Sequence, residues 1–446
     1  MTKYCAISAG MISPKKGNQP FLRAHRYLNY GLLGLASRLG DEALVYHGHF
    51  EEPEHFFSKN LFIQKAPVII LSLPSFYALP WARKFVTHLL GAGSRPEIHI
   101  GGRWVIDQNP EFVRAQFPSN VFVHPGMGEK TICALKSRWS PQKIAVDPCQ
   151  KWQLDYERLV CREEFQPSVE VSRGCGRGCI FCEEANEPLI PLKNPNTLIE
   201  EISSIIHCYG NNRNFYFESS LFAPSWDWVR CFYSEYHRRK MSFLWRTETR
   251  VDVLGAEKLR WLCDAGLRVI DLGLESASPT QIRRMDKSND PIRYLRRAAE
   301  LLRTCHSSGI WAKVNILLFP GETSSTIAET RAFLRENAKS IYGVSTYPVM
   351  VYGVEERARY YESLYRAQGA TGLRRTELDG IWDVDLSDEI DSMTAKKISL
   401  DIAREFMPSR NYFDLKRFSY LDPRYGWEDF RRDASHLDKS VRAFGV

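Results

Sequence analysis

Short apolar runs alternate with amphipathic segments along the first third of the chain. The runs have the length of buried strands and cover residues 4–8, 43–46, 67–73, 97–100 and 120–123. Between several of them, apolar residues recur at three- and four-residue spacing, which predicts helices over residues 21–39, 79–90 and 130–137. This order predicts a doubly wound α/β sheet with its ligand crevice at the C-terminal ends of the strands.

A second series of the same kind begins near residue 165. Its apolar runs cover residues 168–171, 215–217, 243–245, 269–274, 313–318 and 344–348, and each of the first five leads into a helical pattern. Local signals mark the helix ends: a capping box at Thr197 and Glu200, an N-cap with a first-turn proline at Asp290-Pro291, and glycines suited to left-handed C-terminal positions at Gly210 and Gly309. Six strand and helix units predict a full or partial parallel barrel, and we expect a partial (β/α)6 barrel of the TIM type.

These patterns divide the chain into four parts. Residues 1–140 form the predicted doubly wound domain, 141–164 a linker, 165–352 the barrel, and 353–446 a mostly helical C-terminal region. We expect this last region to pack near the open side of the barrel and to shape a substrate pocket. It includes a predicted helix over residues 394–407 and an acidic stretch that we interpret as a solvated loop, with Asp383, Asp385, Asp388, Glu389 and Asp391.

Composition narrows the class of protein. The 446 residues are 44% hydrophobic and 25% charged, which excludes disordered and collagen-like chains. The net charge of +7 comes from basic residues spread along the chain, so nucleic acid is an unlikely partner. The longest apolar stretch, residues 66–82, is interrupted by Pro74 and Pro80, so no bilayer span is expected. The N-terminal residues lack a signal-peptide pattern, and we therefore expect a cytoplasmic protein with its eleven cysteines reduced.

Three cysteines stand within eight residues on the loop after the first barrel strand. Cys175, Cys179 and Cys182 are interleaved with Gly174, Gly176 and Gly178, which allow the backbone to wrap closely and to aim amides at sulfur. Three thiolates can hold three irons of a [4Fe–4S] cluster and leave the fourth iron open to a substrate or cofactor. A structural zinc site needs a fourth ligand, for which only Cys161 or Cys208 is plausible. Ordinary reduced cysteines are the other alternative.

The Cys-x-x-x-Cys-x-x-Cys spacing on such a loop resembles the radical S-adenosylmethionine (SAM) superfamily, over roughly residues 168–348. The resemblance implies that Cys175, Cys179 and Cys182 bind the cluster and that its open iron chelates SAM. Electron transfer from a donor such as flavodoxin or ferredoxin would cleave SAM to methionine and a 5′-deoxyadenosyl radical. Phe181 matches the aromatic residue that packs near the adenine.

Motifs on later strands carry the remaining SAM contacts that the resemblance implies. Glu218 would receive the methionine amine, with a surface carboxylate as the alternative. Either Arg246 or Arg250 would clamp the methionine carboxylate, with an ordinary surface ion pair as the alternative. The residues expected near the ribose or adenine are Glu275, Ser276, Asn315 and Leu317.

The first domain resembles the Rossmann-like cobalamin-binding domain of one radical SAM subclass. The matching positions lie at strand ends and at the start of a helix: Ser72, Gly101, Gly102, Gly126, Gly128 and Glu129. The alternative is a generic doubly wound sheet whose glycines make tight turns. The Asp-x-His-x-x-Gly signature that supplies a histidine to cobalt is missing, and we interpret His47 and His49 as ordinary polar residues of an exposed loop.

The leading functional hypothesis is therefore a cobalamin-dependent radical SAM methyltransferase acting on an unactivated carbon of a small molecule of the secondary-metabolite type. The alternative keeps the radical chemistry but ends in cyclisation, rearrangement or bond formation, with cobalamin in another role or absent. A third hypothesis, of a different class, is a cluster- or cobalamin-containing sensor without turnover.

Overall fold

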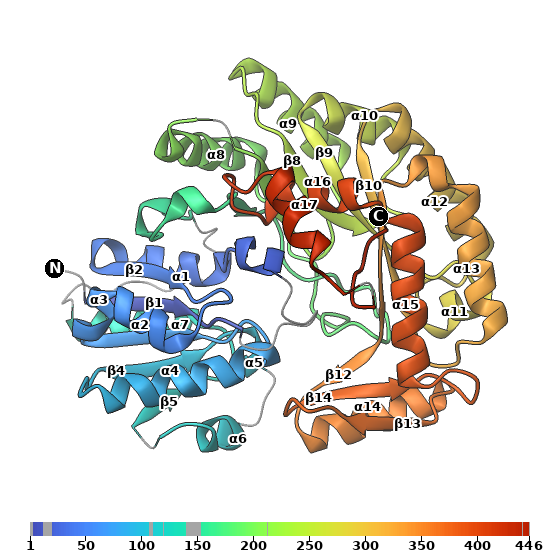
Figure 1. The fold of residues 1–446 in the computed structure, drawn as a ribbon. Coiled ribbons are helices and arrows are strands. Elements are labelled where there is room, and N and C mark those ends of the chain that lie inside the picture. Colours follow the sequence, from blue (N-terminus) through green and yellow to red (C-terminus); the bar gives the residue numbers. More distant parts are fainter. Residues whose placement is uncertain are drawn as a thin grey trace. The chain divides into compact units, whose positions relative to one another are not determined.

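The protein forms two compact units in a computed structural model that describes residues 3–11, 20–106, 110–118, 120–139, 153–211, 213–438 and 440–445. The N-terminal unit comprises Met1–Phe165 and Tyr420–His436. The barrel unit comprises Gln166–Ser419 and Leu437–Val446. Figure 1 shows the elements of both. No helix in the described ranges is long and apolar enough to cross a membrane.

A five-stranded parallel sheet forms the centre of the N-terminal unit. Its strands are β1 (Tyr4–Ser8), β2 (Ala43–His47), β3 (Val68–Ser72), β4 (Glu97–Gly101) and β5 (Val121–Val123), in the order β2-β1-β3-β4-β5. Every residue of β1 and β3 is buried, as expected of central strands covered on both faces. The direction in which strands are added to the sheet reverses between β1 and β3. The C-terminal ends of these two strands therefore mark the switch point of a doubly wound sheet. The predicted fold class is confirmed.

Helices accompany the strands of this sheet. They are α1 (Tyr30–Leu39), α2 (Pro53–Lys59), α3 (Leu61–Lys65), α4 (Leu79–Gly91), α5 (Arg103–Ile106), α6 (Pro110–Ala115) and α7 (Glu129–Trp139). The predicted helix over residues 21–39 is wrong in its first half, where a 3-10 turn (Pro20–Ala24) is followed by extended chain. The cause is Asn29, whose side-chain oxygen accepts a hydrogen bond from the Leu32 amide at 3.0 Å and thereby starts α1 one residue later.

A late segment of the chain belongs to the N-terminal unit. It includes α17 (Trp427–Ser435), where Phe430 packs on Phe21 with ring centroids 5.5 Å apart. The Arg26 amide donates to the Tyr420 carbonyl at 2.6 Å. Residues 420–436, which the sequence pattern had assigned to the C-terminal region, are therefore part of the first unit.

The barrel unit contains a six-stranded parallel sheet. Its strands are β6 (Ser168–Glu170), β7 (Phe215–Glu218), β8 (Trp245–Arg250), β9 (Leu267–Glu275), β10 (Trp311–Leu318) and β11 (Gly343–Pro348). They pair in chain order, and the first and last do not pair with each other in the described residues, which gives a partial barrel. The helices of this unit are α8 (Pro195–Tyr209), α9 (Trp226–Arg238), α10 (Ala256–Asp264), α11 (Pro279–Arg284), α12 (Pro291–Ser307) and α13 (Ser324–Glu336). Figure 1 shows α10, α12 and α13 along the outer side of the sheet.

Two local predictions in this unit need correction. The third strand was predicted over residues 243–245, but it begins at Trp245 and runs to Arg250. Charged residues at alternate positions concealed it, because they point to the inside of the barrel. The capping box at Thr197 and Glu200 is also wrong: α8 starts after Asn194, whose side chain accepts from the Asn196 amide at 2.9 Å.

The other predicted helix ends are confirmed. The Asp290 side chain accepts from the Arg293 amide at 3.0 Å, and Pro291 stands in the first turn of α12. Gly210 and Gly309 have φ angles of 69° and 70°, in the left-handed region.

The C-terminal region of the barrel unit combines helices with a small sheet that the pattern did not predict. The helices are α14 (Glu355–Ala367), α15 (Ser392–Phe406) and α16 (Ser409–Ser419). The antiparallel sheet has the order β12 (Met350–Tyr352), β14 (Ile381–Asp385), β13 (Gly372–Arg375). The solvated-loop interpretation is wrong for Asp383 and Asp385, which lie on β14 and pair with Lys396 at 2.5 Å and Arg374 at 2.8 Å.

Candidate functional site

The three-cysteine loop follows β6 and is built on left-handed glycines. Gly174, Gly176 and Gly178 have φ angles of 70°, 64° and 73°, which side chains with a Cβ rarely adopt. The expectation that these glycines aim amides at sulfur is not met at two positions. The Cys175 amide donates to the Glu187 carbonyl at 3.0 Å, and the Gly178 amide to the Ala185 carbonyl at 3.2 Å. The glycines therefore fold the loop back on its own C-terminal half.

The thiols of this loop lie in one neighbourhood but not at the spacing of a mononuclear site. Burial raises the pKa of Cys182 to about 11, and Cys179 and Cys175 are near enough to contribute to the same shift. Four sulfurs around one zinc ion at about 2.3 Å would be roughly 4 Å apart. In the described residues, the only three metal-ligating groups that lie within 4.8 Å of one another are Cys161, Glu163 and Glu164. The wider spacing of the loop cysteines suits a polynuclear iron–sulfur cluster.

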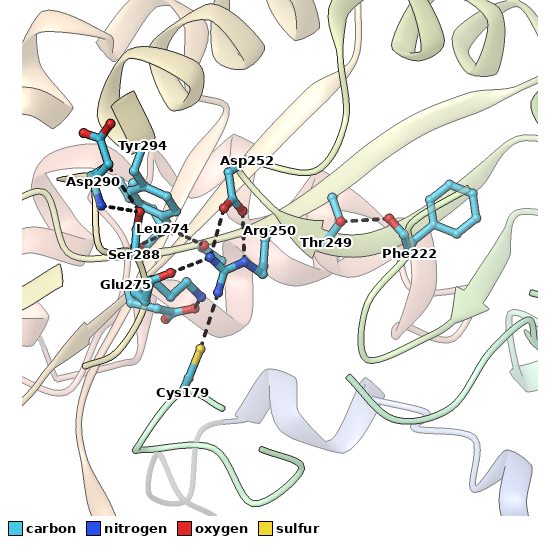
Figure 2. A network of polar contacts seen from close by, with 12 residues as sticks. Cys179, Phe222, Thr249, Arg250, Asp252, Leu274, Glu275, Ser288, Asp290 and Tyr294 are labelled. Carbon is cyan, nitrogen blue, oxygen red and sulfur yellow. Dashed lines mark hydrogen bonds and ion pairs between the residues drawn. The ribbon is translucent and has the colours of Figure 1, made fainter. Parts of the chain in front are cut away.

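Arg250, the last residue of β8, connects the cysteine loop to the barrel strands (Figure 2). Its Nη1 donates to Sγ of Cys179 at 3.4 Å. Its Nε and Nη2 form a bidentate pair with the Asp252 carboxylate at 2.9 and 3.0 Å, and Nη2 also donates to the Lys287 carbonyl at 2.6 Å. Burial alone would lower the pKa of Arg250, but Asp252 outweighs it, and the pKa is raised. The guanidinium is therefore a fixed positive charge beside Cys179.

The predicted ribose and adenine residues fall into two groups. Lys287 links Phe181 and Glu275, because its Nζ donates to the Glu275 carboxylate at 3.1 Å and lies 5.6 Å from the Phe181 ring centre. Glu275 has a φ of 64°, so the chain turns sharply at the end of β9. Ser276 is buried, and its hydroxyl lies 3.2 Å from that of Thr330. The structure thus brings Phe181 and Glu275 together and directs Ser276 into the core.

A row of charged side chains crosses the inside of the barrel sheet. Arg246 on β8 holds Asp271 on β9 through two bonds of 2.5 and 2.8 Å, and its Nη1 donates to the Leu415 carbonyl at 2.8 Å. Lys313 on β10 donates to the same Asp271 at 2.8 Å and to Asn315 at 3.0 Å. Burial alone would raise the pKa of Asp271, but the two cations hold it well below its ordinary value. Arg246 is consequently paired with Asp271, and Asn315 belongs to the same hydrogen-bond network through Lys313. Leu317 lies two positions further along β10 on the same face as Asn315.

Two carboxyl groups in this row form no ion pair among the described residues, although Arg246 lies near enough to act on both. Glu218 accepts from the Ser168 hydroxyl at 2.7 Å, and burial raises its pKa to about 8. Burial and the neighbouring Asp271 raise the pKa of Glu248 to about 7. In the part of the chain that the structure describes, no side-chain hydrogen bond to the Glu248 carboxylate is found. The two groups are adjacent because Phe217 on β7 pairs with Thr247 on β8.

Several residues of this site were not singled out from the sequence. They are Glu248, Asp252, Asp271, Lys287 and Lys313. Asp271 carried a usable signal, since a carboxylate inside a continuous apolar strand needs a buried partner. The others stand at exposed-looking polar positions, where the sequence does not distinguish the inside of a barrel from solvent.

The predicted cobalamin positions gather at the C-terminal edge of the N-terminal sheet. At the β1–β3 switch point, the Asn29 side-chain amide donates to the hydroxyls of Ser8 and Ser72 at 3.2 and 3.1 Å. Ser72 is thus engaged within the protein. A Cβ atom on Gly102 would lie 2.6 Å from the Leu73 amide nitrogen, so this glycine serves chain packing.

The other glycines of this edge differ in the space around them. A Cβ on Gly101 would meet only the His124 carbonyl at 3.7 Å, and one on Gly126 would meet nothing within 4 Å. A Cβ on Gly128 would lie 2.7 Å from the Leu35 side chain, and Glu129 begins α7. An added Cβ therefore has room at Gly101 and Gly126 but not at Gly102 or Gly128.

The exposed-loop expectation is wrong for His47, which ends β2 and is buried, while His49 lies in the turn that follows and is half-buried. His47 is buried and stacks on His49 with centroids 5.5 Å apart, while Phe165 packs 4.9 Å from the His47 ring. Burial lowers the pKa of His47 to about 3, and its Nε2 accepts from the Asn29 amide at 2.9 Å. His47 is therefore a neutral packing residue.

Comparisons with known proteins bear on the family and on the fold. Residues 169–334 match the family described as the radical SAM superfamily. The whole fold is similar to TsrM from Kitasatospora setae, a radical SAM methyltransferase solved with cobalamin and a [4Fe–4S] cluster (TM-score 0.60, 14% identity, covering 100% of this chain and 93% of TsrM). It is also similar to OxsB, a cobalamin-dependent SAM radical enzyme solved with aqua-cobalamin (TM-score 0.65, 15% identity, covering 99% and 72%). No curated protein sequence matches the chain.

Proposed function

Residues 169–334 form a radical SAM domain, and from that premise we propose that the protein is a cobalamin-dependent methyltransferase acting on an unactivated carbon of a small molecule. The observation that carries the proposal is the likeness of fold over both units to TsrM and OxsB, whose structures hold cobalamin. TsrM is named as a methyltransferase, and we propose the same reaction type for this protein because it has the same pair of domains.

In the barrel unit, the chain's own residues prepare a buried, polar place for SAM. Cys175, Cys179 and Cys182 would hold the cluster, and a donor such as flavodoxin or ferredoxin would reduce it. Glu218, with a pKa of about 8, is uncharged at neutral pH until a cation approaches. The methionine ammonium of SAM would favour its ionised form and form a charge-assisted hydrogen bond. Bound together, the cluster and SAM supply the 5′-deoxyadenosyl radical, and cobalamin supplies the methyl group.

In the N-terminal unit, a flat, bulky ligand would lie beside Gly101 and Gly126, where an added Cβ would meet no atom closer than 3.7 Å. Small residues there let a corrin approach the backbone. The described residues place no exposed histidine at the end of β2, so we propose that cobalamin is bound without a histidine ligand from that strand.

The alternative function is a radical cyclisation, rearrangement or bond-forming reaction in which cobalamin is absent or has another role. The engagement of Ser72 by Asn29 favours it, because the Ser72 hydroxyl, at the switch point where ligands of doubly wound sheets usually bind, is already used within the protein.

The deciding experiment is to express the protein with hydroxocobalamin, purify and desalt it anaerobically, and measure corrin released per polypeptide. We expect a ratio near one. With SAM and a strong reductant, methyl transfer to an accepted substrate forms both S-adenosylhomocysteine and 5′-deoxyadenosine. Folded protein with an intact cluster but no corrin, producing only 5′-deoxyadenosine, would move the alternative into first place. Absence of any SAM cleavage would favour the sensor hypothesis.

A further inference from the structure

Arg250 is the most completely fixed cation near the cysteine loop. Its Nε and Nη2 are held by Asp252, and Nη2 also donates to the Lys287 carbonyl. The Tyr294 ring centre lies 5.8 Å from the guanidinium carbon, and the Tyr294 hydroxyl is itself tied to the Gly273 carbonyl at 3.0 Å. Four of the five guanidinium N–H groups are accounted for, the fourth by Cys179. The side chain is 10% exposed and has little freedom to swing away.

From this geometry we propose that Arg250 is a positioning residue for the iron–sulfur cluster: its Nη1–H donates to the Cys179 thiolate and raises the cluster's reduction potential, while Asp252 limits the increase. The inference rests on the assignment of Cys179 as a cluster ligand and is independent of whether cobalamin is bound. It assigns Arg250 a role different from a clamp on the SAM carboxylate.

The physical reason is the change of charge on reduction. Accepting an electron makes the cluster and its thiolates more negative, so a nearby N–H donor and positive charge stabilise the reduced form more than the oxidised one. The effect is larger in a buried place, where water screens less. Asp252 carries the opposite charge on the far side of the same guanidinium, so it weakens the effect and also holds the group in position.

The contacts also distinguish Arg250 from the other arginine of the same strand. A bidentate clamp on a carboxylate uses Nη2 together with either Nε or Nη1, and on Arg250 the Nη2 hydrogens are engaged by Asp252 and the Lys287 carbonyl. Arg246, four residues earlier on β8, instead donates to Asp271 and to the Leu415 carbonyl. Arg250 joins β8 to Cys179 of the loop (Figure 2).

The test is an EPR-monitored redox titration of the reconstituted full-length protein without SAM, comparing wild type with Arg250→Gln, Arg250→Lys and Asp252→Asn. Iron and sulfide per polypeptide establish that each variant carries its cluster. The matched control is Arg284→Gln, which removes a partly buried guanidinium that donates to the Gly321 carbonyl at 2.8 Å and not to sulfur.

We expect Arg250→Gln to make reduction about tenfold less favourable, a shift of about 59 mV to lower potential for a one-electron couple. Arg250→Lys keeps the positive charge but loses the planar guanidinium and its bidentate contact with Asp252. It should therefore shift the potential in the same direction by a smaller amount. Asp252→Asn should shift it upward, and Arg284→Gln should leave it unchanged. The opposite signs at positions 250 and 252 are the signature that a merely structural role would not produce.

An unchanged potential in a cluster-loaded Arg250→Gln protein would overturn the proposal, and so would a downward shift in both the 250 and 252 variants. Wild-type protein that assembles no cluster would overturn the ligand assignment itself. Absence of corrin with these shifts intact would instead count against the proposed methyl transfer and leave the role of Arg250 standing.

Discussion

The two parallel sheets of this protein present opposite chemistry at their C-terminal edges. The N-terminal sheet ends in small or uncharged residues, with Ser8 and Ser72 bridged by Asn29 and with open space beside Gly126. The barrel sheet ends in ionisable residues, which we call its charged edge: Arg250 carries a fixed charge, and Glu218 is a carboxyl group whose pKa is raised to about 8. Both edges belong to the same general architecture, so the difference lies in the side chains placed there. Small residues admit a bulky flat ligand close to the backbone, while buried charges hold a polar one.

The strongest test of the charged edge is removal of the cluster ligands. Replacing Cys175, Cys179 or Cys182 by alanine should abolish 5′-deoxyadenosine formation and strongly reduce bound iron, because two loop thiolates can hold only two irons of the cluster. Iron content and SAM cleavage under dithionite measure the effect. Cys231→Ala, on helix α9 outside the loop, is the matched control and should retain both. Retained cleavage in any of the three loop variants would contradict the assignment.

The second test concerns the buried ion pair between Arg246 and Asp271 in the barrel sheet. Asp271→Asn should lower stability by about 3–5 kcal/mol, because Arg246 and Lys313 are left without their counter-charge. Asp227→Asn, which breaks an exposed pair with Arg230 at 3.7 Å, should cost less than about 1 kcal/mol. Thermal unfolding of the two variants side by side measures the difference. Equal midpoints would mean that the charged row does not stabilise the barrel.

The third test places a larger side chain at Gly126, near the C-terminal edge of the N-terminal sheet. Gly126→Val should weaken cobalamin retention at least tenfold, or about 1.4 kcal/mol, and leave cluster content unchanged. Gly93→Val is a close control, since Gly93 and Gly126 both have a φ of 86° and no atom within 4 Å of an added Cβ. The two variants therefore carry similar backbone strain. Equal corrin content in both would place cobalamin elsewhere.

The smallest expected effect is on the pH dependence of stability. Glu248 has a folded pKa of about 7 against an ordinary value of 4.5, so the folded state binds more protons between these values. Stability should therefore decline as pH rises through this window and level off above pH 7. Glu248→Gln should remove part of this slope and stabilise the protein by about 1 kcal/mol at pH 8 relative to wild type. Denaturant unfolding at pH 5 and pH 8 measures it, and an unaltered slope would refute the shift.

Many local features could be predicted from causes within a few residues. The apolar runs gave the strands of both sheets to within one or two residues at most ends, and Asp290-Pro291 marked the start of α12. Two errors were themselves local, because the Asn29 and Asn194 side chains cap helices whose starts were predicted elsewhere. The third barrel strand was predicted over residues 243–245 but lies at 245–250, because Arg246 and Glu248 interrupt the apolar pattern and are satisfied or enclosed inside the barrel.

The sequence by itself determined the order of strands and helices, the three-cysteine loop and its left-handed glycines, because each follows from short-range spacing and backbone sterics. Only the tertiary structure decided what each charged side chain does. Arg246 meets Asp271 across 25 positions and Arg250 meets Cys179 across 71, whereas Glu248 is left without such a partner. The free energy of a buried charge depends on which distant group shares its low-dielectric surroundings, and residue spacing along the chain does not contain that information.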